Sequence, residues 1–218
     1  MLGIAFIGGE GPNPETIKEI ARDADLLVAA DCGLIACEEA GLAPDWIVGD
    51  MDSVAGEAGP ARPPRLEKYP PERVIRYPRD KDHTDTELAI NLLREKGCGE
   101  IWLSGGGGGR TDHLFAVRSL FERENPPQRW FTHNEEIRCL GEGCSLRESR
   151  VRGSLVSVFP LGTGQWAAES SSLKWPLDGL TWERGSFGLS NEVMDSPFEI
   201  RSVRGRFMVI MPMIFYGE

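Results

Sequence analysis

The sequence predicts an α/β protein: an N-terminal parallel-sheet Rossmann-like α/β domain, residues 1–132, followed by a small C-terminal antiparallel β-sandwich or barrel domain, residues 133–218. In the first part, short apolar runs alternate with helical patterns, which is typical of βαβ units and a parallel sheet. In the second part, short β-like runs are separated by Gly, Ser and Pro and show no helical period. Closely spaced strands of this kind are typical of small antiparallel proteins.

Six apolar runs are the candidate strands of the first domain. They are Leu2–Ile7, Leu26–Ala30, Trp46–Val48, Val74–Tyr77, Ile101–Leu103 and Arg129–Thr132. The expected helices are 13–23, 33–40, 84–96 and one that begins near Asp112. Asn13 can cap the first helix and Pro14 suits its first turn, while Gly97 is a typical stop for the third.

The remaining elements are less regular. Several prolines among charged residues make Ala61–Pro71 unsuitable as a central element, so this stretch is expected to be an exposed loop. In the second domain, five short runs are the candidate strands. They are Glu136–Leu140, Ser154–Phe159, Gln165–Glu169, Glu199–Val203 and Arg206–Met211.

The composition narrows the function. The formal net charge of −10 argues against a general nucleic-acid binder, because such proteins need clustered Lys and Arg. An acidic protein can still bind a Mg-nucleotide, because divalent cations bridge carboxylates to phosphates. No apolar run approaches the roughly 18 residues of a membrane span, and the first residues show neither a basic leader nor a cleavage site. We therefore expect a cytoplasmic protein that binds neither nucleic acid nor a membrane.

Polar loops follow five of the predicted strands. These loops contain Gly8-Gly9, Asp31-Cys32-Gly33, Gly49–Ser53, Asp80–Asp85 and Gly105–His113. In an open parallel sheet, ligands bind outside the carboxyl ends of the strands, so the five loops should converge at one edge. Asp50 and Asp52 can both direct hard oxygen ligands at one cation if their loop is extended. Together the loops predict a metal-dependent, phosphate-handling site.

Each acidic loop also has a plain structural interpretation. Asp50-Met51-Asp52 has a composition that is common in turns. Thr84 or Asp82 can cap the helix that follows, and Asp80-Lys81 is expected to form a solvated face. It is the position of these loops at consecutive strand ends that favours a common site.

Five consecutive glycines, Gly105–Gly109, would elsewhere suggest a flexible linker. Here they lie between an apolar strand and a predicted helix, where close approach of the backbone to phosphates requires glycine. Arg110 adds a planar donor fork for phosphate oxygens, and Asp112 adds a further carboxylate. The run has neither the GK[ST] ending of a Walker loop nor the GxGxxG pattern of NAD-binding proteins.

The ordered set of motifs resembles the thiamine pyrophosphokinase (thiamine diphosphokinase) family. The matching segments are Ala30–Gly33, Pro44–Ser53, Asp82–Asp85 with Glu87, Gly108–His113, Ser172–Leu177 and Gly188–Glu192. They follow the family's order from residue 30 to residue 192 and cover most of the chain. Two positions depart from the family: Cys32 stands where a second glycine is common, and Val193-Met194 stands where an aromatic residue can occur.

The resemblance implies a homodimer that transfers a diphosphate group from ATP to the hydroxyl of thiamine, giving thiamine diphosphate and AMP. It implies a nucleotide-binding catalytic domain and a β-rich thiamine-binding domain, with the thiamine site near the subunit interface. The catalytic residues would be Asp50, Asp52, Asp82, Asp85, Arg110 and Asp112. Mg²⁺ would be held by Asp50, Asp52, Asp82 and Asp112. Contacts to nucleotide, phosphates or thiamine would come from Asp31, Thr84, Gly108, Gly109, Arg110, Ser190 and Asn191.

The chemistry of such a transfer asks mainly for positioning and charge neutralisation. Either Asp82 or Asp85 could take the hydroxyl proton, and the sequence does not choose between them. Two alternatives from other classes stay open. An aspartate-nucleophile phosphatase, suggested by Asp50-Met51-Asp52, would form a phospho-aspartyl intermediate and release no AMP. A nonenzymatic nucleotide or thiamine sensor would bind its ligands without turnover.

Overall fold

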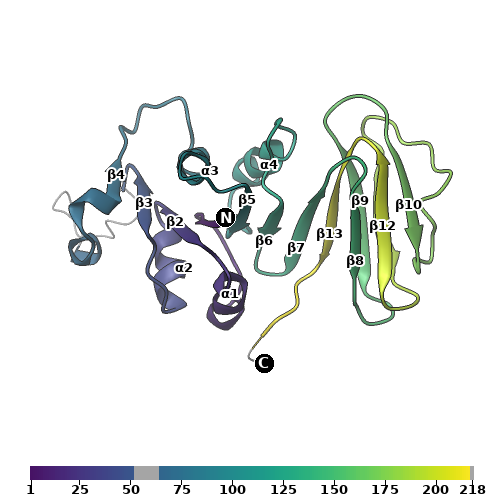
Figure 1. The fold of residues 1–218 in the computed structure, drawn as a ribbon, viewed down its shortest axis with the longest axis horizontal. Helices are drawn as coiled ribbons and strands as arrows, with labels where there is room; N and C mark the ends of the chain where they lie inside the picture. The colour runs from purple at the N-terminus through teal and green to yellow at the C-terminus, as the bar shows by residue number, and fades with distance from the viewer. Residues whose placement is uncertain (52–63, 217–218) are drawn as a thin grey trace. The chain divides into compact units, whose positions relative to one another are not determined.

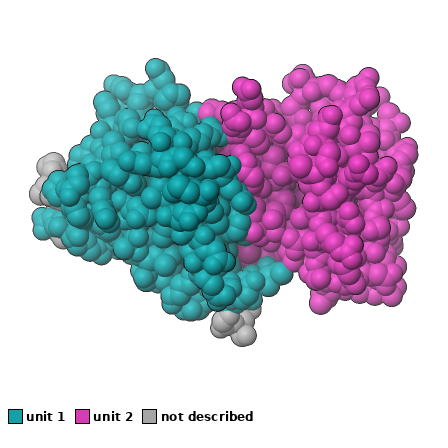
Figure 2. Space-filling model, in the orientation of Figure 1, with its two compact units in different colours: residues 1–117, 130–134, 214–218 teal, residues 118–129, 135–213 magenta. Residues whose placement is uncertain are grey.

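The computed structural model describes residues 1–51 and 64–216. It is a mixed α/β structure with one large mixed sheet and a separate three-stranded antiparallel sheet. The chain divides into two compact units, which are coloured separately in Figure 2. Unit 1 contains residues 1–117, 130–134 and 214–218, and unit 2 contains residues 118–129 and 135–213. Within the described ranges, no helix is long and apolar enough to cross a membrane.

Unit 1 is built on parallel strands. In sheet order they are β5 (Glu100–Ser104), β1 (Leu2–Phe6), β2 (Leu26–Ala30), β3 (Trp46–Gly49) and β4 (Val74–Arg76). Every neighbouring pair in this series is parallel, and Ile4 lies opposite Leu27 on one side and Trp102 on the other. β6 (Arg129–Phe131) lies beside β5. The parallel pairing predicted for β1 to β5 is confirmed.

Helices cover both faces of these parallel strands (Figure 1). The helices are α1 (Pro14–Ala21), α2 (Gly33–Glu39), α3 (Asp85–Glu95) and α4 (Thr111–Leu120). Asn13 caps α1 as predicted, because its side chain accepts a hydrogen bond from a backbone N–H three residues on, at 2.8 Å. Ile4 and Phe6 pack with side chains of α1 and α2. Gly3 points to the opposite face, where its missing side chain makes room for Leu93 of α3.

The segment predicted as an exposed loop, Ala61–Pro71, is partly buried. Residues 61–63 lie outside the described residues. A short 3₁₀ helix, η2 (Pro64–Lys68), follows, and a second one, η3 (Pro71–Arg73), begins at the end of the segment. Leu66 is fully buried and Tyr69 is 9% exposed, and both pack in a core cluster with residues of β2, β3 and α2. The prediction of an exposed loop is therefore wrong for this part of the segment, because Leu66 and Tyr69 pack inward.

Unit 2 contains antiparallel strands in two sets. One set runs in the order β11 (Gly188–Glu192), β9 (Leu155–Leu161), β13 (Arg206–Pro212) and β7 (Glu135–Leu140), and the other in the order β10 (Ala167–Ser171), β12 (Phe198–Arg204) and β8 (Ser145–Glu148). Both sets contribute side chains to one core cluster, which includes Val158 and Phe207 from the first set and Ile200 from the second. The five predicted strands are confirmed. β8 and β11 were not predicted, because both are short and mostly polar in sequence.

Candidate active site

Two aspartates directly follow neighbouring parallel strands. Asp31 comes after β2 and Asp50 after β3, and the N–H of Asp31 donates to the carbonyl oxygen of Val48 at 2.9 Å. Because parallel strands end at the same edge of a sheet, both carboxylates lie at the carboxyl edge. Asp31 is 9% exposed and has a φ of 45°, a left-handed conformation in which Asp is among the tolerated residues.

A third carboxylate comes from the start of α3. Thr84 caps this helix in a capping box: its hydroxyl accepts from the N–H of Glu87 at 3.3 Å, and the Glu87 carboxylate accepts from the N–H of Thr84 at 2.8 Å. The cap holds Asp85 in place as the first helical residue. Asp31, Asp50 and Asp85 each offer an oxygen within 4.8 Å of the other two. We call these three residues the acidic cluster.

The acidic cluster has the donor chemistry of a site for a hard divalent cation. Mg²⁺ and similar ions prefer carboxylate oxygens. Three carboxylates this close repel one another unless positive charge lies beside them. Among the residues that the structure describes, this is the one group of metal-ligating side chains that gathers so closely. The cluster therefore fits Mg²⁺.

Gly49 makes room for the acidic cluster. It precedes Asp50 and has a φ of 140°. A Cβ atom at this position would lie 3.0 Å from Oδ1 of Asp85 and 3.3 Å from Cβ of Asp31. Any side chain would therefore enter the space between the carboxylates, and the backbone conformation itself favours glycine.

Lys81 lies beside the acidic cluster. Its Nζ is 3.0 Å from Oδ1 of Asp85 and 3.9 Å from Oδ2 of Asp50, and its side chain is 13% exposed. The prediction that Lys81 belongs to a solvated face is therefore wrong. In the sequence, the only sign that Lys81 belongs to the site is its position in the acidic loop before α3.

The glycine run Gly105–Gly109 packs closely on the loop that follows β1. Glu10 and Gly107 exchange backbone hydrogen bonds at 2.7 and 2.9 Å. A Cβ atom at Gly108 would lie 2.4 Å from the carboxyl carbon of Glu10, whereas one at Gly109 would meet no atom within 4 Å. The sequence suggested that these glycines let the backbone approach phosphates closely. At Gly107 and Gly108 the backbone instead approaches Glu10 of the same chain, whereas the space beside Gly109 is open.

Arg110 and Asp112 bind each other at the start of α4. The Arg110 guanidinium donates to both carboxylate oxygens, from Nε at 3.1 Å and from Nη2 at 2.5 Å, and the two side chains are 71% and 61% exposed. The hydrogen bond from Arg110 lowers the pKa of Asp112, and the same bond raises the pKa of Arg110. Asp112 is therefore held in an exposed ion pair and is not part of the acidic cluster.

The other predicted residues of unit 1 have different positions. Asp82 is exposed in the loop before α3 and does not belong to the acidic cluster. The hydroxyl of Thr84 donates to the Glu87 carboxylate at 2.9 Å, so it takes part in the helix cap. Asp52 lies outside the described residues and stays a predicted metal ligand.

Cys32 fits the turn after β2 because Gly8 has no side chain. A Cβ atom at Gly8 would lie 2.6 Å from Sγ of Cys32, and one at Gly33 would lie 2.1 Å from the carbonyl oxygen of Phe6. Burial, together with the charge of Asp31, raises the pKa of the Cys32 thiol. The thiol is therefore a neutral packing group at neutral pH.

In unit 2, Ser190 and Asn191 are neighbours on β11 with opposite exposure. Ser190 is exposed and has a φ of 57°. Asn191 is 5% exposed, and its side chain donates to the carbonyl oxygen of Trp175 at 2.6 Å and accepts from the N–H of Trp175 at 3.1 Å. Asn191 thereby holds the backbone of Trp175, whose side chain is half exposed and whose ring centroid lies 4.5 Å from Nζ of Lys174.

Comparison with known sequences identifies similar proteins. A family model described as "Thiamin pyrophosphokinase, catalytic domain" matches residues 17–128, just over half of the chain. This range contains the whole acidic cluster. A thiamine pyrophosphokinase of Bacillus subtilis (strain 168) is 26% identical over 189 residues, which cover 85% of this chain and 86% of that protein.

Solved structures share the fold. The chain matches a thiamine pyrophosphokinase from Bacillus subtilis with a TM-score of 0.76 and 22% identity, over 98% of this chain and 100% of that one. A thiamin pyrophosphokinase from Geobacillus thermodenitrificans matches with a TM-score of 0.74 and 24% identity, over 98% of each chain. One from Candida albicans matches with a TM-score of 0.72 and 14% identity, over 98% of this chain and 89% of that one.

Proposed function

The chain belongs to the thiamin pyrophosphokinase family, and on that premise we propose that this enzyme transfers a diphosphate group from ATP to the hydroxyl of thiamine, giving thiamine diphosphate and AMP. The observation that carries the proposal is the acidic cluster at the carboxyl edge of the parallel strands, inside the region that the family model matches. Open α/β sheets bind ligands at this edge. The relatives do not favour the phosphatase or the sensor.

The proposed Mg²⁺ ligands are Asp31, Asp50 and Asp85, which together provide the carboxylate oxygens that this ion prefers. When bound, the metal would offset the negative charge of the phosphates of ATP. This proposal revises the ligand set predicted from the sequence by leaving out Asp82 and Asp112, which do not belong to the acidic cluster, and it keeps Asp52 as a predicted ligand.

Other residues are assigned by their exposure and partners. Arg110 is proposed to bind phosphate oxygens with its exposed guanidinium, which Asp112 orients through two hydrogen bonds. Gly109 offers open backbone next to it. Asp82 is proposed to take the hydroxyl proton, because Asp85 is committed to the acidic cluster.

We further propose that residues 1–132 are the nucleotide-binding catalytic domain, that residues 133–218 are the thiamine-binding domain, and that the enzyme is a cytoplasmic homodimer. Ser190 has an exposed hydroxyl, and Leu189 beside it is 62% exposed. Trp175 adds a half-exposed aromatic ring. Exposed apolar side chains of this kind support a thiamine site near a subunit interface.

The reaction can be tested by incubating the protein with ATP, Mg²⁺ and thiamine and separating the products by chromatography. We expect AMP and thiamine diphosphate to form in equal amounts, and to require all three components. Inorganic phosphate with a phosphorylated protein would indicate a phosphatase. Binding of ATP and thiamine in a calorimeter without any AMP would indicate a sensor.

Substituting Gly49 should disrupt the acidic cluster. In Gly49→Ala, the new Cβ would crowd Asp85 and Asp31, and the residue would be held in a left-handed conformation. We expect a loss of stability of about 1–3 kcal/mol from the backbone strain and a loss of Mg²⁺-dependent AMP formation from the crowding. Urea unfolding and the product assay measure the two effects.

Gly97→Ala is the matched control for this substitution. Gly97 has a φ of 90°, but a Cβ atom there would meet no atom within 4 Å. This variant should lose stability through backbone strain and keep its Mg²⁺-dependent activity. If both variants keep full activity, Gly49 does not shape the metal site.

A further inference from the structure

Lys81 provides the acidic cluster with a positive charge from the protein itself. Its ammonium group is 3.0 Å from a carboxylate oxygen of Asp85 and 3.9 Å from one of Asp50. Together with Asp31, the four side chains carry a formal charge of −2, whereas the three carboxylates without Lys81 would carry −3. Part of the mutual repulsion of the carboxylates is therefore relieved before any metal binds.

The position of Lys81 also places it in the way of a metal ion. Its side chain is 13% exposed, so the ammonium group lies against the acidic cluster and does not extend into solvent. The Lys81 ammonium group already contacts Oδ1 of Asp85, so a metal ion that took this oxygen as a ligand would lie close to the ammonium group. Two cations this close repel each other, and the repulsion is stronger at a site with limited solvent than in water.

We propose that Lys81 competes with the divalent metal for the acidic cluster, so that the metal binds tightly only together with the phosphates of the nucleotide. The phosphates give the Lys81 ammonium group another anionic partner, which leaves the carboxylates to the metal. Metal and nucleotide then increase each other's affinity by the same factor. This inference rests on the proposed function, because it takes the acidic cluster as the metal site of an ATP-using enzyme.

The test measures the affinity for Mn²⁺, from the electron paramagnetic resonance signal of the free ion, with and without α,β-methylene-ATP. In the wild type, the nucleotide analogue should tighten Mn²⁺ binding strongly. In Lys81→Met and Lys81→Gln, Mn²⁺ without nucleotide should bind about tenfold more tightly than in the wild type, or more, because a repelling charge is gone. The further gain from the nucleotide should shrink. Lys81→Arg should behave like the wild type.

Two controls separate Lys81 from the metal site itself. Lys18→Met removes the charge of an exposed lysine that pairs with Glu15, and should leave Mn²⁺ binding unchanged. Asp50→Asn should weaken Mn²⁺ binding with nucleotide present. If Asp50→Asn has no effect, the metal site is misplaced, and both the proposed ligands and the role of Lys81 are overturned. If Asp50→Asn weakens binding but the neutral Lys81 variants bind Mn²⁺ no more tightly, the role of Lys81 alone is overturned.

The unfolding temperature provides a second measurement. Metal-free Lys81→Met should melt below the wild type, because Asp85 and Asp50 lose the ammonium group that pairs with them. Mn²⁺ without nucleotide should raise the unfolding temperature of this variant more than that of the wild type. An equal rise in both proteins would contradict competition between Lys81 and the metal.

Discussion

Replacing Asp50 by Asn should lower the rate of AMP formation at saturating Mg²⁺ and ATP by about 100-fold or more. Loss of even an indirect partner of a metal ligand typically costs about 10–100-fold in metal affinity or activity, so loss of a direct ligand should cost at least as much. Asp50 follows β3 and lies in the acidic cluster with Asp31 and Asp85. An amide keeps the shape of the side chain but removes the charge that a divalent cation requires.

The fold should survive this substitution, which makes the kinetic result interpretable. Asp50→Asn removes one of three carboxylates that repel each other, so the metal-free protein should unfold at the same temperature or a higher one. Stabilisation by Mg²⁺ with the ATP analogue should fall at the same time. Asp23→Asn, which changes an exposed aspartate outside the acidic cluster, is the matched control and should keep wild-type activity. Wild-type turnover by Asp50→Asn would rule out the proposed metal site.

The parallel sheet and its acidic edge could be predicted from the sequence because they depend on short-range patterns. Apolar runs indicate the strands, and Asp31 and Asp50 come directly after two of them. Parallel pairing then brings both residues to one edge without any knowledge of side-chain packing. Thr84 is one of two candidate caps in the sequence, and the structure shows that it caps α3 and so places Asp85 at the start of this helix.

The partners within the site could not be predicted, because they depend on tertiary distances. In the sequence, Lys81 is one more charged residue of a loop. Its contact with the acidic cluster depends on the conformation of the loop before α3. Arg110 and Asp112 form a pair with each other, although both residue types equally suit phosphate and metal. Gly108 packs on Glu10, a contact between segments almost a hundred residues apart. Charge and residue type indicate that a site exists, whereas packing decides which groups meet in it.

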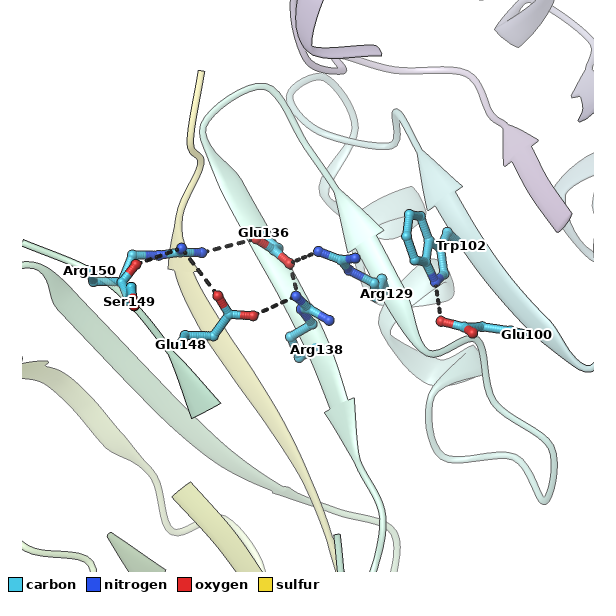
Figure 3. Close-up of polar contacts among 8 residues, drawn as sticks. All are labelled: Glu100, Trp102, Arg129, Glu136, Arg138, Glu148, Ser149 and Arg150. Carbon is cyan, nitrogen blue, oxygen red and sulfur yellow. Dashed lines mark hydrogen bonds and ion pairs between the residues drawn. The ribbon is translucent and has the colours of Figure 1, made fainter. Parts of the chain in front are cut away.

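Replacing Glu136 by Gln should destabilise unit 2 by about 3–5 kcal/mol, the usual cost of removing one partner from a buried ion pair. Glu136 is 7% exposed and binds three arginines, as Figure 3 shows. Its Oε1 lies 2.5 Å from Nη2 of Arg129 and 2.5 Å from Nε of Arg138, and its Oε2 lies 3.0 Å from Nη2 of Arg150. Glu148 also binds Arg138 and Arg150, but it cannot neutralise three guanidinium groups.

The effect should be measured by urea unfolding at pH 7, followed by circular dichroism. Glu169→Gln is the matched control in the same unit, because Glu169 pairs with Arg201 at 3.8 Å and both side chains are more than half exposed. An exposed pair of this kind contributes about 0–1 kcal/mol. If the two variants lose equal stability, the buried arginines do not depend on Glu136.

Acid should reduce the difference between the wild type and Glu136→Gln. Burial by itself would raise the pKa of Glu136, but the charges of Arg138, Arg129 and Arg150 outweigh burial and hold this pKa below its ordinary value of 4.5. The folded protein therefore binds the proton less readily than the unfolded chain does. The stability that the carboxylate contributes is fully present above about pH 4.5 and is lost as the pH falls through the folded-state pKa.

The Gln side chain in Glu136→Gln does not titrate, so this variant lacks the stabilisation by a charged carboxylate at every pH. The difference in unfolding free energy should therefore stay constant from pH 7 down to about pH 5 and narrow only below the ordinary pKa. Unfolding curves of both proteins at several pH values test this directly. A difference that widens as the pH falls would mean that the arginines do not stabilise the charged form of Glu136 in the folded state.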